Sequence, residues 1–166
     1  MPDVVLYSVT QRFHHSWIWF LVLITPSLFS GLFILDILSD NNSSDSMYSN
    51  PLLLMVIIAI CAAPIFLIYL AKLDTQVRNE GLFIKFRPFH RRWVMLPFHD
   101  IVEANAITYK PLKDYGGWGI RYGPKGKAYN VSGNKGVLLK FEDGPSILIG
   151  STNHQVLCSL ITDMLE

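Results

Sequence analysis

The chain has 166 residues, of which 51% are hydrophobic and only 16% charged, and its formal net charge is +1. Abundant apolar residues and only two cysteines exclude a disordered chain and a disulfide scaffold. All but two of the basic residues, Arg12 and Lys72, lie in residues 74–166. The chain therefore divides into an apolar first part, 1–73, and a second part with ordinary charge.

Two long apolar runs occupy the first part, at 17–38 and 51–73, and each contains one charged residue near its end. At a rise of about 1.5 Å per residue, helices of this length extend about 33–35 Å, whereas a bilayer core is about 30 Å thick. A cleaved signal peptide is the alternative, but the first run is too long and no small-residue cleavage site follows it. These runs predict a two-helix transmembrane hairpin.

The segment that joins the two runs, residues 39–50, contains no Lys or Arg. Basic residues flank the runs on the other side, with Arg12 before the first and Lys72 and Arg78 at or after the end of the second. Because basic residues near span ends stay in the cytoplasm, both termini are predicted to be cytoplasmic.

From Asp74 the pattern changes to short strands separated by turn residues. Leu82, Ile84 and Phe86 alternate with Phe83 and Lys85, which is typical of a half-buried strand. The further predicted strands are 92–96, 101–110, 119–122, 127–131, 136–141 and 146–149. A helix capped by Ser151 follows, with apolar residues at steps of three and four. Residues 74–166 are therefore predicted to form a curled antiparallel β-sheet or barrel capped by a C-terminal α-helix, which makes the whole chain an α+β membrane protein.

This order of elements is that of a pleckstrin-homology (PH) fold. The segment LDTQVRNEGLFIKFRPFHRRWVMLPFHDI after a pair of spans resembles the membrane-tethered PH-like domains of bacteria. The block YGGWGIRYGPKGKAYNVSGNKG and the earlier QRFHHSWIW are similar to an uncharacterised family of small bacterial two-span membrane proteins. This resemblance covers most of the chain and implies a location in the bacterial plasma membrane. It implies no activity, catalytic residue or cofactor.

Two segments are candidate binding surfaces. In the first, Arg87, His90, Arg91 and Arg92 surround an aromatic residue, and each basic residue near an anionic membrane contributes about 1 kcal/mol. A solvated hairpin loop is the alternative interpretation of this segment. The second is rich in glycine and interleaves aromatic, basic and amide side chains that are candidates to line a ligand or partner surface. These are Trp118, Arg121, Tyr122, Lys125, Lys127, Tyr129 and Asn130.

The glycine-rich block matches neither of two nucleotide-binding motifs. A P-loop would need an earlier glycine before Gly126 and a Ser or Thr after Lys127. The dinucleotide fingerprint would need a third glycine where this sequence has Tyr122. Tight β-turns with packed aromatics are the equally weighted alternative. The five histidines show no metal-ligand spacing, and no nucleophile motif occurs. The sequence therefore predicts no metal, no cofactor, no catalytic residue and no nucleic-acid partner.

The function that these patterns favour is a non-enzymatic membrane protein whose PH-like domain binds another protein or an anionic lipid headgroup, with the lipid bilayer itself as a partner. An accessory subunit or assembly factor of a larger membrane complex is the first alternative. A membrane-surface enzyme that uses Asp100, Glu103 and Asp114 is the second.

Overall fold

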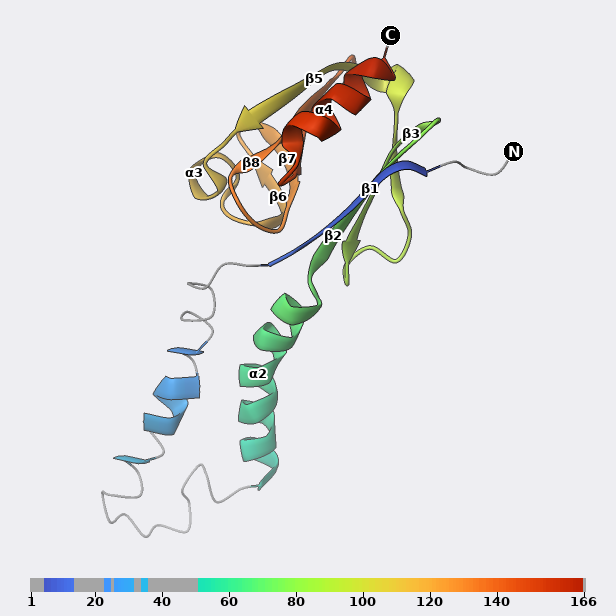
Figure 1. Ribbon diagram of the computed structural model, residues 1–166. Helices are drawn as coiled ribbons and strands as arrows, with labels where there is room; N and C mark the ends of the chain where they lie inside the picture. Colours follow the sequence, from blue (N-terminus) through green and yellow to red (C-terminus); the bar gives the residue numbers. More distant parts are fainter. Residues whose placement is uncertain (1–4, 14–22, 25, 32–33, 36–50, 166) are drawn as a thin grey trace. The chain divides into compact units, whose positions relative to one another are not determined.

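The computed structural model describes residues 5–13, 23–24, 26–31, 34–35 and 51–165 (Figure 1). The chain forms two compact units. One contains Met1–Phe13 together with Ala71–Glu166, and the other is the intervening segment His14–Leu70. The first unit, called the β unit below, is therefore assembled from two separate stretches of the chain.

Sheet A of the β unit has four antiparallel strands in the order β1-β2-β3-β4. Their bounds are β1 Val5–Arg12, β2 Lys72–Arg78, β3 Gly81–Arg87 and β4 Val94–Pro97. Alternate residues of β2 and β3 are buried, including Leu73, Val77, Ile84 and Phe86. This period of two directs one face of the sheet toward the core and the other, the outer face, away from it.

Sheet B has five strands in the order β5-β8-β9-β7-β6. Their bounds are β5 Ile101–Thr108, β6 Gly119–Gly123, β7 Gly126–Asn130, β8 Lys135–Phe141 and β9 Ile147–Gly150. β7 and β9 run parallel, whereas the other neighbouring pairs are antiparallel. A 3-10 turn, Phe98–Asp100, precedes β5, and the short helix α3, Pro111–Tyr115, follows it.

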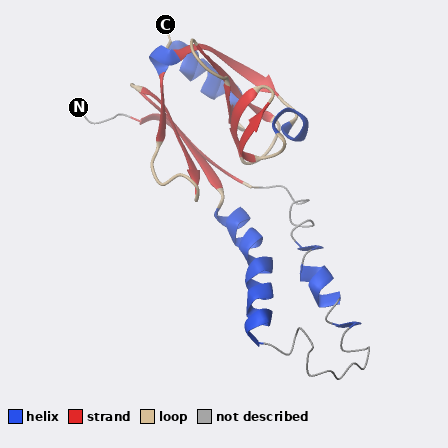
Figure 2. Cartoon of the chain, turned by 180° about the vertical axis from the view of Figure 1, so that it is seen from behind, coloured by secondary structure: helices blue, strands red, loops and turns tan. Residues whose placement is uncertain are grey.

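Helix α4, His154–Asp163, completes the β unit and packs against β5 and β8 (Figures 1 and 2). Its Leu157 and Ile161 are fully buried, as expected for residues four apart on one helical face. They belong to one apolar cluster with Leu73 and Ile84 of sheet A and Leu139 of sheet B. This cluster therefore joins both sheets to the helix.

The predicted transmembrane hairpin is not found. In the parts of the chain that are described, no helix has the length and apolar character that a membrane crossing requires. The second predicted span, 51–73, is divided: helix α2 covers Pro51–Leu70, and Lys72 and Leu73 belong to β2. Most of the first predicted span, 17–38, lies outside the described residues, and residues 23–24, 26–31 and 34–35 of it are helical.

The fold class of a two-span α+β membrane protein is therefore wrong, and so are the transmembrane keywords and the plasma-membrane location with two spans and cytoplasmic termini. One physical reason is visible at the end of α2. Hydropathy alone does not fix where a helix ends, and here backbone pairing with β3 draws residues 72 and 73 into a strand. Apolar side chains such as Met55, Ile58 and Phe66 are exposed on α2.

The β-strands and the terminal helix of residues 74–166 are present, but they form two sheets rather than one curled sheet. The predicted boundary at residue 73 also differs from the observed units, because β1 pairs with β2 along almost its whole length. The terminal helix begins at His154 after Asn153, and Ser151 is a buried residue before it.

Candidate functional site

The outer face of sheet A brings together basic residues that are far apart in the sequence. Arg12 of β1 lies opposite Lys72 of β2, and Lys72 lies opposite Arg87 of β3. Directly paired residues of antiparallel strands point to the same face. These three residues, called the basic row below, therefore stand side by side across three strands.

A carboxylate lies next to the basic row. Asp74 is 7% exposed and accepts a hydrogen bond of 2.7 Å from the Thr10 hydroxyl. The Nε atom of Arg87 lies 3.0 Å from the other oxygen of Asp74. Lys85 of β3 is paired with Asp74 across the strands. One acidic group therefore lies among the cations of this face and forms an ion pair with Arg87.

Further along the same face, cationic side chains lie over aromatic rings. The guanidinium carbon of Arg78 is 4.4 Å from the centroid of Phe83 and 5.8 Å from that of Trp93. The Nζ atom of Lys85 is also 5.8 Å from the Trp93 centroid. Such contacts hold the charge in place while leaving it positive. Strands β1, β2 and β3 thus carry five basic side chains on the outer face, Arg12, Lys72, Arg78, Lys85 and Arg87, against the carboxylate of Asp74.

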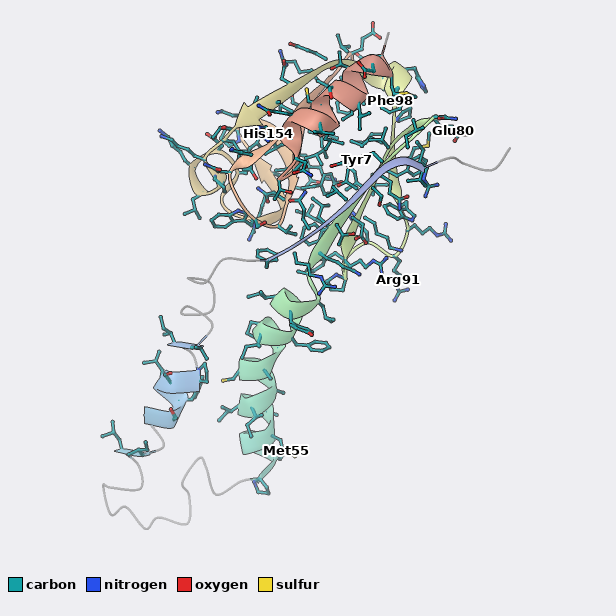
Figure 3. The ribbon with its side chains drawn as sticks, in the orientation of Figure 1. Tyr7, Met55, Glu80, Arg91, Phe98 and His154 are labelled. Carbon is teal, nitrogen blue, oxygen red and sulfur yellow. The ribbon has the colours of Figure 1, made fainter. Side chains whose placement is uncertain are left out.

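The loop from β3 to β4 adds two more cations, because Arg91 and Arg92 are both exposed. Figure 3 shows Arg91 at the end of sheet A opposite to Glu80, which lies in the turn between β2 and β3. This turn residue is therefore remote from the loop arginines. The positive charge concentrates at the end of the sheet where the basic row lies.

His90, which the sequence grouped with these arginines, points inward instead. Its Nδ1 accepts a hydrogen bond of 3.3 Å from the backbone N–H of Phe86, and the backbone N–H of His90 donates to the Phe86 carbonyl at 2.7 Å. Its ring meets that of Tyr129 edge to face at 5.7 Å between centroids. Burial, and secondarily the charge of Lys127, lowers the pKa of His90 below 6.5. His90 therefore orders the loop that displays Arg91 and Arg92.

Of the four residues predicted for the first candidate surface, Arg87, Arg91 and Arg92 are exposed at one end of sheet A, and His90 supports them. The sequence pattern does not place Arg12 and Lys72 in this surface, because each lies near the end of a predicted span and serves there as a marker of orientation. Only the register of β1 on β2 and of β2 on β3 shows that they complete the row.

The residues of the second candidate surface are engaged with one another and with the backbone. The indole N–H of Trp118 donates to the Gly133 carbonyl at 3.0 Å, and the Nε–H of Arg121 donates to the Trp118 carbonyl at 2.9 Å. The Nζ of Lys125 lies 3.2 Å from a carboxylate oxygen of Asp114. Many polar groups of this hairpin therefore form hydrogen bonds or ion pairs within the protein and stabilise its fold.

Two of the predicted surface residues are buried. Tyr129 is 1% exposed, and Asn130 is fully buried. The Asn130 side chain accepts from the Gly119 N–H and donates to the Tyr109 hydroxyl, each at 3.0 Å. Burial raises the pKa of Tyr109 to about 12, so this phenol stays neutral. These residues form a polar network inside sheet B.

Lys127 connects the buried and exposed parts of this block. Its Nζ lies 4.7 Å from the centroid of Tyr129 and 5.2 Å from that of Tyr122. Although burial opposes the charge, hydrogen bonding to the two phenols gives a net rise in the pKa of Lys127. Tyr122 is 75% exposed.

The carboxylates considered for catalysis lie in separate places. Glu103 Oε2 is 2.6 Å from the Nζ of Lys140, Asp100 is 3.2 Å from the Nε2 of His99, and Asp114 pairs with Lys125. Hydrogen bonding to Lys140 lowers the pKa of Glu103, and the Lys110 backbone N–H lowers that of Asp114. Among the described residues no group of three or more His, Cys, Asp or Glu is placed to hold a metal ion.

A scan of protein-family models finds no match to the chain, and a search of curated proteins finds none either. The resemblance to bacterial two-span proteins therefore stays a prediction.

Proposed function

We propose that this protein is a non-enzymatic binding protein, and that the outer face of sheet A binds an acidic segment of a partner protein. The observation that carries this proposal is the basic row, in which Arg12, Lys72 and Arg87 occupy neighbouring positions on three adjacent strands. Like charges directly opposite one another destabilise a sheet. Because the fold holds these three basic residues next to one another, their electrostatic repulsion lowers its stability, and a bound anionic ligand would offset that repulsion.

The surroundings of the basic row support the same proposal. Asp74 lies beside it but is already shared between Thr10 and Arg87. Arg91 and Arg92 add exposed charge from the adjacent loop. Several side-chain carboxylates in one extended segment would match cations that are spread over three strands and a loop.

The proposal is tested with the full-length protein and a fluorescein-labelled oligoglutamate peptide, whose binding is followed by fluorescence anisotropy. The double variant Arg12→Gln/Lys72→Gln removes two charges of the row. The control, Lys113→Gln/Lys135→Gln, removes two exposed charges from α3 and β8. We expect the row variant to bind at least about tenfold more weakly and the control to stay within about twofold of the wild type.

Equal affinity of the row variant and the wild-type protein would contradict the proposal. Anionic phospholipid vesicles and a single-stranded oligonucleotide are tested beside the peptide. If either of them binds more tightly than the peptide and loses affinity in the row variant, the face recognises another class of anion and the protein-partner proposal fails.

A further inference from the structure

We infer that the acidic partner binds by strand addition, pairing its backbone with the free edge of β1 and placing its acidic side chains beside the basic row. This inference rests on the proposed function and specifies how the partner is held. An added strand gains affinity from backbone hydrogen bonds and specificity from alternate side chains.

Of the four strand edges, that of β1 lies next to the basic row, because Arg12 belongs to β1. Sheet A ends in β1 and β4, and sheet B ends in β5 and β6. β4 has four residues and ends in Pro97, which has no N–H to donate. β5 packs against α4, and β6 packs against α3. β1 is eight residues long and pairs with β2 alone among the strands that the structure describes.

β1 also lacks the residues that usually protect an edge strand. Exposed edges in native proteins commonly carry lysine, proline or inward-pointing charges. Residues 5–11 of β1 contain none of these, and Val5 and Leu6 are 44% and 48% exposed. The irregularity in its pairing with β2 is confined to Val5–Tyr7. From Tyr7 to Arg12 the pairing with β2 is regular, and among the described residues no strand pairs with the other edge, while the buried Gln11 side chain donates to the Gly150 carbonyl.

Side chains of β1 alternate between the two faces of sheet A, and this alternation indicates which residue types suit each position of the added strand. Ser8, Thr10 and Arg12 pair with outer-face residues of β2, so side chains of the partner opposite them would point to that face. A carboxylate of the partner opposite Arg12 would place a negative charge beside the three positive charges of the basic row. The intervening side chains would lie beside half-buried Tyr7 and Val9, which favours apolar residues there. The expected ligand alternates acidic and apolar residues.

The test uses two labelled peptides of alternating valine and glutamate that differ only in backbone methylation. N-methyl groups on alternate residues remove the N–H donors of one edge while leaving charge and side chains unchanged. We expect the methylated peptide to bind the full-length protein at least about tenfold more weakly. Hydrogen exchange followed by mass spectrometry should show slower exchange in β1 only with the unmethylated peptide.

The outcomes separate this inference from the proposal on which it rests. If both peptides bind equally and β1 exchange is unchanged, strand addition is excluded but the basic row still binds acidic chains. If neither peptide binds and oligoglutamate also fails, both proposals fall. Slower β1 exchange that rises with protein concentration in the absence of peptide would assign the edge to a second copy of this chain and overturn the inference.

Discussion

The outer face of sheet A and the hairpin β6–β7 carry the same kinds of residues but use them differently. Both combine basic and aromatic side chains, and both are candidate surfaces in the sequence. In the hairpin, Arg121 bonds a carbonyl, Lys125 pairs with Asp114, and Lys127 lies between two tyrosines. On sheet A, the carboxylate of Asp74 lies next to the basic row and pairs with one of its members, Arg87.

This comparison shows that residue type alone does not identify a binding surface. A cation whose charge is matched by its own fold contributes to folding and leaves less for a ligand. Cations that the fold places side by side without a matching number of carboxylates keep a positive potential that attracts an anionic partner. The sheet A face is therefore the better candidate, and the hairpin is expected to act mainly on stability.

The largest expected difference between the two regions is in the loss of stability when a side chain is truncated to alanine. Tyr129→Ala should lower the free energy of unfolding by about 3–5 kcal/mol, because the ring is buried between the sheets and the cavity does not refill. The exposed Arg91→Ala should change it by less than about 0.5 kcal/mol. Urea denaturation measures both, and a cost below about 1 kcal/mol for Tyr129→Ala would show that the hairpin is not part of the core.

A second comparison concerns two glycines of the glycine-rich block. Gly126 has φ +106°, and a Cβ there would collide with the backbone carbonyl oxygen of Ser146, just before β9. Gly133 has φ +72° and open space around it. Gly126→Ala should therefore cost more than about 2 kcal/mol of stability, and Gly133→Ala about 1 kcal/mol. Equal costs in thermal unfolding would mean that backbone conformation alone, without close packing, explains both glycines.

Local periodicity predicted the strands well. The alternation of Leu82, Ile84 and Phe86 gives β3, and a similar pattern gives β8, to within one residue of the observed bounds. Local patterns do not predict β1, because its partner β2 begins about sixty residues later and no local signal indicates which distant strand will pair with it. The predicted candidate surface contains Arg87, Arg91 and Arg92. It does not contain Arg12 and Lys72, which lie next to Arg87 only because β1 pairs with β2 and β2 pairs with β3.

The electrostatic contribution of the loop should be smaller than these packing effects. Arg91→Gln/Arg92→Gln should weaken oligoglutamate binding by several-fold, since each exposed cation near an anionic ligand contributes roughly 1 kcal/mol or less. Raising the salt concentration to about 0.5 M should reduce this difference, because exposed charges are screened. Anisotropy titrations at low and high salt measure both effects, and a difference that persists at high salt would indicate a packing role for the loop.

The smallest effect is a pH dependence centred on His90. Because burial and Lys127 lower its pKa, the unfolded chain binds a proton more readily than the native protein. The contribution of His90 to stability is therefore complete above the unfolded pKa, near 6.5, and is lost as the pH falls through the lower native pKa. The unfolding free energy of the wild type should fall more steeply below that pH than that of His90→Gln. Parallel curves for the two proteins would contradict this assignment.

The most direct test of the central claim is to measure stability and affinity together on Lys72→Gln, which removes the middle charge of the basic row. If the row is maintained for binding, the substitution relieves repulsion, so the free energy of unfolding should rise by about 0.5 kcal/mol while the affinity for oligoglutamate falls. A loss of stability with unchanged peptide affinity would show that Lys72 serves the fold, and would contradict the account.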